Sequence, residues 1–192
     1  AERFKNIQID ALYSSDLCRA VTTAGAITKY HKLELTKTPR LREINCGPWE
    51  GVPFGNVEYY YPEQMSYFNS DPDRWRVDGA ETFEQCRERI RSVLTDIARE
   101  HDGQTVAVVS HGMAIRTILS YFLGVRSEDI RTLPHGDNTS VSLLYFDGEK
   151  FLVEYYNDNS HLPAEISTFA KQTWWRNGVG PDRANLRDEP LD

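Results

Sequence analysis

A histidine lies where a predicted strand meets a predicted helix. Residues 106–109 are wholly apolar, Ser110-His111-Gly112 follows, and a second apolar segment with helical spacing begins at once. Ligands of open α/β sheets bind at the carboxyl ends of strands, and a helix N-terminus there offers N–H groups and a positive dipole end to a phosphate. We expect His111 and Gly112 to bind an anion; a histidine that only satisfies the helix terminus is an equal alternative.

Two further segments carry groups suited to phosphate chemistry. Arg19 lies in the first turn of a predicted helix that follows a strand, and its guanidinium matches phosphate oxygens. Glu43 and Glu50 lie in the Gly- and Pro-rich segment 39–51, where a carboxyl group near an apolar wall can act as a general acid. Taken singly, a surface arginine and exposed loop glutamates are the more common interpretation.

Strands that alternate with helices predict an α/β protein with helices on both faces of the sheet. Its strands are expected at 9–15, 33–38 and 104–110, its helices at 16–30, 79–101 and 112–123, and a hairpin at 139–157. Asp16 is the expected N-cap of the first helix, and Thr82 with Gln85 predicts a capping box. The strand at 104–110 should be buried on both faces because it is almost wholly apolar.

Several features are interpreted as structural or peripheral. Arg87, Arg89 and Arg91 interleave with acids and are expected to be solvated. The aromatic-rich segment 52–78 predicts an insertion of short helices that serves as a lid or simply as core. The sequence after residue 163 predicts a helix that frays. Residues 1–192 are expected to form a single domain.

Composition excludes some classes of protein. The chain has 192 residues and a formal net charge of −7, which argues against binding to nucleic acid or an anionic membrane. No apolar run could span a bilayer, and no signal peptide opens the chain. Three widely spaced cysteines, Cys18, Cys46 and Cys86, predict reduced thiols in a cytoplasmic protein without a zinc site.

Three motifs together resemble the histidine phosphatase superfamily, which includes the phosphoglycerate mutases. They are "YSSDLCRAVTTA", "LREINCGPWEG" and "VVSHGMAIR", in the family's order and approximate spacing, and the resemblance runs from about residue 7 to 162. It implies a three-layer α/β/α sandwich with a mostly parallel sheet. It also implies transfer through a phosphohistidine, with Arg19 and His111 holding the phosphoryl group, Glu43 as the acid, and no metal or organic cofactor.

One departure from the family is clear. The nucleophilic histidine of the family lies in an Arg-His-Gly motif after the first strand, and this chain has no such motif. His31, His101, His135 and His161 do not lie at a strand end near the start of the chain. We therefore expect the first strand and its nucleophile to lie upstream of Ala1.

The expected activity is hydrolysis of a small phosphomonoester, since the segment between Gly51 and Gly79 is short for a cofactor-dependent mutase. Mutase-type phosphoryl transfer and a non-catalytic anion-binding module are the alternatives. The expected partner is a small phosphorylated metabolite; a homodimer is left open, and the substrate cannot be named from the sequence.

Overall fold

A small parallel sheet forms the centre of the protein. The computed structural model describes residues 1–168, with strands β1 (Ala11–Ser15), β2 (Leu35–Thr38) and β3 (Val106–Val109) in the order β2-β1-β3. Both neighbours run parallel to β1, with Leu12 opposite Leu35 on one side and Ala107 on the other. The carboxyl ends of the three strands therefore lie at one edge of the sheet.

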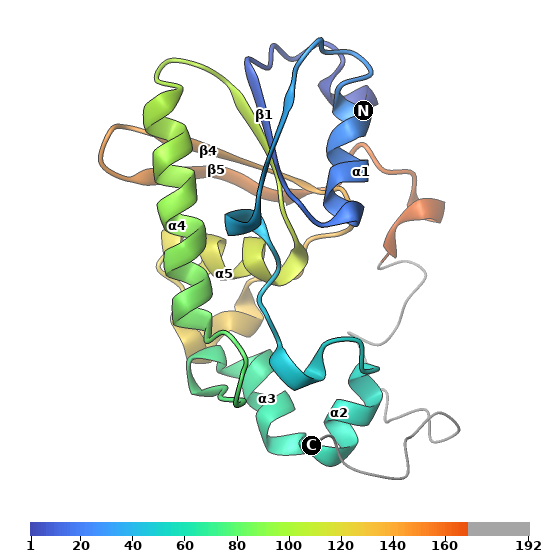
Figure 1. The fold of residues 1–192 in the computed structure, drawn as a ribbon, viewed down its shortest axis with the longest axis vertical. Coiled ribbons are helices and arrows are strands. Elements are labelled where there is room, and N and C mark those ends of the chain that lie inside the picture. The colour runs from blue at the N-terminus through green and yellow to red at the C-terminus, as the bar shows by residue number, and fades with distance from the viewer. Residues whose placement is uncertain (169–192) are drawn as a thin grey trace.

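Helices cover both faces of this sheet. The helix α1 (Cys18–Ile27) packs on the face that carries Leu12 and Val109, and α4 (Phe83–Glu100) packs on the face that carries Tyr13 and Val108. Figure 1 shows α1 and α4 on opposite sides of the strands. The predicted α/β class with three layers is confirmed, because alternate residues of each strand point to opposite faces.

A hairpin and one more helix complete this part of the molecule. The strands β4 (Val141–Phe146) and β5 (Phe151–Asp158) pair antiparallel as a separate two-stranded sheet, which confirms the predicted hairpin. The helix α5 (Gly112–Phe122) packs against β5, where the rings of Phe122 and Phe151 stack with centroids 4.8 Å apart.

The expectation that β3 is buried on both faces is wrong. Its four residues are only partly buried, although all of them are apolar. The reason is its pairing: β3 bonds β1 along one edge, and no strand of residues 1–168 pairs with the other edge. An apolar strand with an unpaired edge is unusual in a parallel sheet.

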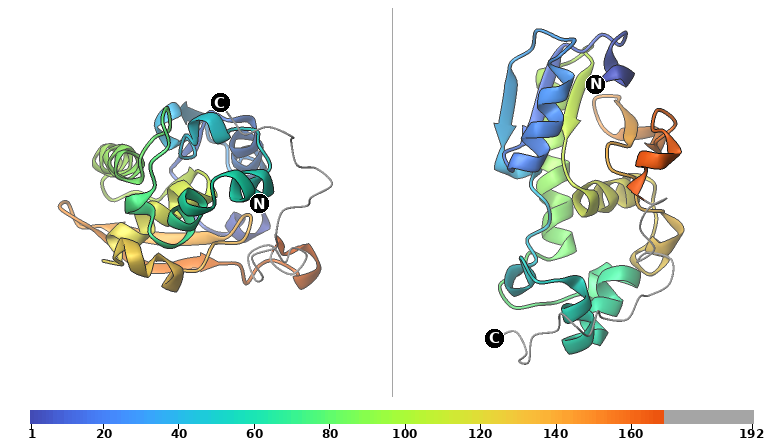
Figure 2. Two further views of the ribbon diagram at one scale, coloured as in Figure 1. Left: turned by 90° about the horizontal axis from the view of Figure 1, so that it is seen from below. Right: turned by 90° about the vertical axis from the view of Figure 1, so that its right-hand side faces the viewer.

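A lobe of short helices lies beyond the sheet. It contains α2 (Phe54–Tyr60), α3 (Pro62–Ser70) and the 3₁₀ turns Gly47–Trp49 and Pro72–Arg74. The views in Figures 1 and 2 show these helices at the end of the molecule opposite the N-terminus. The segment 52–78 is thus helical, as predicted.

The aromatic residues of the lobe are mainly core. Trp75 is fully buried and makes edge contacts with Trp49, Phe68 and Phe83 at centroid distances of 5.3–5.6 Å. Because Phe83 opens α4, these contacts attach the lobe to the long helix. Phe54 and Tyr59 are exceptions, with 60% and 54% of their surface exposed.

The ends of the helices follow the sequence in one of the two predicted cases. Thr82 and Gln85 form the predicted capping box of α4, with Gln85 N donating to Thr82 Oγ1 at 3.2 Å. Gly124 follows α5 with a positive φ of 67°, which favours glycine. Asp16 is not the N-cap of α1: Leu17 is, because the Asp16 carboxylate binds Arg42 instead.

Short 3₁₀ turns lie near both ends of the described residues. Residues 1–6 contain a 3₁₀ turn at Glu2–Phe4, and Ala164–Ile166 forms another. Most of the tail predicted after residue 163 lies outside the described residues.

Candidate active site

His111 lies at the carboxyl end of β3 and is the N-cap of α5. It is 7% exposed. Arg19 Nε donates to His111 Nδ1 over 3.0 Å, and His111 Nε2 lies 2.8 Å from Ser15 Oγ. Because arginine can only donate, Nδ1 must accept, so the neutral ring carries its proton on Nε2 and donates it to Ser15.

The surroundings of His111 favour the neutral ring. Burial is the main cause that lowers the pKa of His111, to about 4, and the charges of Arg19 and Arg89 act in the same direction. Asp16 opposes them. A dianionic phosphate placed here would reverse this balance, because a nearby negative charge favours the imidazolium.

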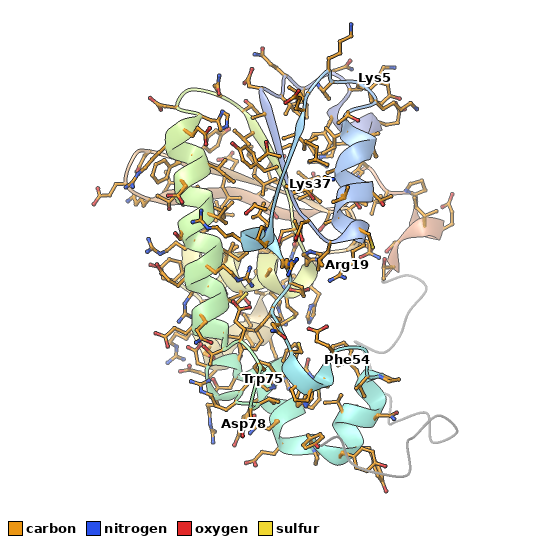
Figure 3. The ribbon with its side chains drawn as sticks, in the orientation of Figure 1. Lys5, Arg19, Lys37, Phe54, Trp75 and Asp78 are labelled. Atoms are coloured by element: carbon orange, nitrogen blue, oxygen red, sulfur yellow. The ribbon has the colours of Figure 1, made fainter. Side chains whose placement is uncertain are left out.

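Arg19 is positioned to bind an anion. It is the second residue of α1, directly beyond the end of β1, and its side chain is exposed. Only its Nε is used for His111, and its two Nη groups make no bond to residues 1–168. Figure 3 labels Arg19 at the end of the sheet that faces the lobe carrying Phe54. The sequence thus correctly predicted that Arg19 and His111 converge.

Glu43 binds the N-terminal turn of α5, the helix that His111 caps. Its carboxylate accepts from the backbone N–H of Met113 at 3.0 Å and of Ala114 at 2.7 Å. It also accepts from the N–H of Ile44. Burial raises the pKa of Glu43, while these three amides and the charge of Arg19 act against that rise. A carboxyl group with a raised pKa is suited to general acid work.

The contacts of Glu43 correct one expectation. We predicted free N–H groups at the start of α5 as the seat for a phosphate, but Glu43 already occupies those of Met113 and Ala114. The space beside Gly112 is open, since a Cβ there would meet nothing within 4 Å. A role of Gly112 in binding therefore depends on this open space and not on the amides that follow it.

The other glutamate of the loop has a local role. Glu50 is exposed, and its Oε1 accepts from the N–H of Cys46 at 2.9 Å, which closes a turn. No bond joins Glu50 to His111 or Arg19 in the described part of the chain.

Two residues near the site were missed by the sequence analysis. Ser15 accepts from His111, and its position as the last residue of β1 was the only available signal. Arg89 was expected to be solvated, which is wrong: its side chain is 22% exposed and bonds Glu81 and three backbone carbonyls. These contacts of Arg89 could not be predicted from the sequence, because the carbonyls lie 46 to 49 residues away along the chain.

The remaining histidines are engaged elsewhere. His31 bonds the carbonyl of Phe4, His101 bonds Tyr13, His135 accepts from Arg116, and His161 bonds Arg3. Residues 1–168 contain no group of three His, Cys, Asp or Glu side chains that could hold a metal ion. None of the helices in that range is long and apolar enough to cross a membrane.

Comparison with known proteins identifies the family. Residues 1–159 match the model of the histidine phosphatase superfamily, branch 1, and the chain belongs to this family. It is 33% identical to phosphoglycerate mutase-like protein 4 of Arabidopsis thaliana, over 96% of this chain and 77% of that protein. It is 29% identical to phosphoserine phosphatase 1 of Hydrogenobacter thermophilus, over 84% of this chain and 76% of that protein.

A solved structure supports the same assignment. YhfR of Bacillus stearothermophilus superimposes with a TM-score of 0.79 at 28% identity, covering 83% of this chain and 79% of that one. The resemblance drawn from three sequence motifs is therefore confirmed by both sequence and fold.

Proposed function

We propose that this protein is a phosphatase that hydrolyses a small phosphomonoester through a phosphohistidine intermediate. The observation that carries the proposal is the bond between Arg19 and His111 at the strand ends, with Glu43 bound to the first turn of the adjoining helix. Phosphoryl transfer needs positioning and neutralisation of a spread negative charge more than covalent chemistry from the protein.

Each residue has a defined task in this mechanism. The free Nη groups of Arg19 bind two phosphoryl oxygens, and His111 Nε2–H turns from Ser15 to a third. Glu43 donates its proton to the oxygen of the departing alcohol, and the carboxylate that results stays bound to the amides of α5. The name of the H. thermophilus relative supports a small phosphorylated metabolite as substrate.

The proposed mechanism also requires a nucleophilic histidine. Of the five histidines of the chain, only His111 lies within two residues of the carboxyl end of a described strand. The unpaired edge of β3 and the separate β4–β5 sheet leave a place where one more strand could pair. We propose that the nucleophilic histidine follows such a strand, supplied from outside residues 1–192, which would place it beside His111.

Two polypeptides test this proposal: residues 1–192 alone, and a longer natural product that includes an upstream strand ending in Arg-His-Gly. Both are assayed with p-nitrophenyl phosphate and then for acid-labile phosphate on histidine. We expect activity and labelling only in the longer polypeptide. Equal activity of a folded 1–192 polypeptide would show that the nucleophile lies within it.

The alternatives have their own support. Mutase-type transfer is favoured by the similarity to phosphoglycerate mutase-like protein 4. It would appear in the same assay as transfer of the phosphoryl group to a second hydroxyl compound in place of water. A non-catalytic anion-binding module would bind phosphate in both polypeptides and turn over substrate in neither.

A further inference from the structure

Glu43 lies on a loop that has no regular structure of its own. Residues 42–46 connect the 3₁₀ turn Pro39–Leu41 to the next turn at Gly47, and they form neither helix nor strand. Neither a sheet ladder nor helical hydrogen bonds therefore fix the backbone that carries the carboxyl group. Catalytic groups must be held within about 0.5 Å of their working position, so other contacts must hold this loop.

Arg89 of α4 makes several of those contacts. Its Nη1 donates to the carbonyl of Arg40 at 2.8 Å and to that of Arg42 at 3.0 Å, and its Nη2 lies 3.4 Å from the carbonyl of Glu43. Its Nε and Nη2 each donate to one oxygen of Glu81 at 2.7 Å. One guanidinium thus binds the loop and its own counter-ion at the same time.

Glu81 holds the loop at a further point. Its backbone N–H donates to the carbonyl of Asn45 at 2.8 Å, and its side chain accepts from the N–H of Asn45 at 3.3 Å. The backbone also comes very close nearby, because a Cβ added to Gly47 would lie 2.8 Å from the amide nitrogen of Ala80. The loop is therefore fixed on both sides of Glu43.

An exposed ion pair on the same helix offers a contrast. Within residues 1–168 the side chain of Arg91 binds only Glu88, three residues earlier, and both side chains are well exposed. Arg89 and Glu81 are 22% and 16% exposed. An exposed ion pair such as Arg91–Glu88 contributes little to stability. Arg89, in contrast, also bonds backbone carbonyls that lie 46 to 49 residues away in the sequence.

We infer that Arg89 and Glu81 are positioning residues for Glu43, and that they set the efficiency of proton donation to the leaving group. The inference rests on the proposed function, since it requires Glu43 to be the acid. Lysine at position 89 would keep the positive charge, but its single ammonium cannot serve a bidentate carboxylate and separate carbonyls in one geometry.

The test compares two substrates in the longer polypeptide proposed above, with its upstream strand, which is called the full-length protein from this point on. An alkyl phosphomonoester such as phosphoserine needs a proton on its leaving oxygen, whereas p-nitrophenolate needs little help. We expect Arg89→Lys to lower kcat for the alkyl substrate by about 10²-fold, as small misplacements of catalytic groups do, and to lower it much less for p-nitrophenyl phosphate. Glu81→Gln should show the same selectivity, and Arg91→Lys should match the wild type with both substrates.

The outcomes separate this inference from the proposed function. Equal losses with both substrates, or no loss, in folded Arg89→Lys or Glu81→Gln protein would overturn the positioning role. Glu43→Gln is measured alongside: a selective loss there with none in the other two variants would leave the acid assignment intact and overturn only this inference. An unselective Glu43→Gln would overturn the acid assignment and the positioning role with it.

Discussion

His111 and Glu43 belong to one candidate site, but different kinds of structure hold them. His111 lies at the junction of β3 and α5, where a strand ladder and a helix fix the backbone on either side. Glu43 lies on an irregular loop, and side chains from α4 and from the segment before it hold that loop. A residue placed by regular elements depends on the sheet as a whole, whereas a residue placed by side chains can be displaced by one substitution.

The largest effect should come from the part of the site built on regular elements. Arg19→Ala in the full-length protein removes the cation that bonds His111 and that, in the proposed mechanism, binds the phosphoryl oxygens. Arginines that stabilise the charge of phosphoryl transfer contribute about 10³–10⁵-fold to kcat, so we expect a loss in that range. Steady-state kinetics with p-nitrophenyl phosphate measure it.

Arg126→Ala is the control for this experiment, because the Arg126 side chain is exposed and, in the described part of the chain, binds only Glu128 and Asp129. Near-normal turnover by Arg19→Ala would show that the bond between Arg19 and His111 has no part in the reaction.

The loop should give a smaller effect that depends on the substrate. Glu43→Gln keeps the shape of the side chain and removes the acidic proton, so we expect a loss of about 10²–10⁴-fold with an alkyl phosphomonoester and little with p-nitrophenyl phosphate. Glu50→Gln, on the same loop, is the matched control. A greater loss from Glu50→Gln would assign the proton to Glu50.

The buried imidazole should make stability depend on pH. The pKa of His111 is lowered in the folded protein to about 4, against an ordinary value of 6.5. The unfolded chain therefore binds the proton first, and stability falls as the pH drops from about 6.5 towards 4 and is unaffected above that window. The full effect is up to about 3 kcal/mol.

Urea denaturation at about pH 7 and about pH 4.5 measures this difference in the wild type and in His111→Gln. The variant should lose less stability on acidification. His135 will still contribute in both proteins, because burial also lowers the pKa of His135 to about 4. An identical pH dependence of the two proteins would contradict the assignment to His111.

The smallest effect is expected from a chelator. In the proposed mechanism Arg19 and His111 neutralise the phosphoryl charge, and the described residues contain no cluster of metal ligands. We therefore expect EDTA to leave kcat of the full-length protein unchanged. Loss of activity that a divalent ion restores would refute the phosphohistidine mechanism.

The two parts of the site also differ in how far the sequence predicts them. His111 and Arg19 could be placed together because each follows an apolar strand, and the carboxyl ends of parallel strands share one edge. No periodicity describes the loop of Glu43, so the choice of Glu43 over Glu50 as the expected acid came only from the family resemblance. Arg89 was wrongly assigned to the surface. The burial of β3 was overestimated because composition does not reveal which edges of a strand are paired.

The bonds from Met113 and Ala114 to Glu43 have a consequence for local dynamics. Among residues 1–168 these two amides have no other partner, so they exchange hydrogen with water only when the Glu43 carboxylate moves away. Exchange of either amide therefore requires the Glu43 carboxylate to leave the first turn of α5. The exchange rates of these two backbone hydrogens thus record how often the Glu43 carboxylate leaves α5.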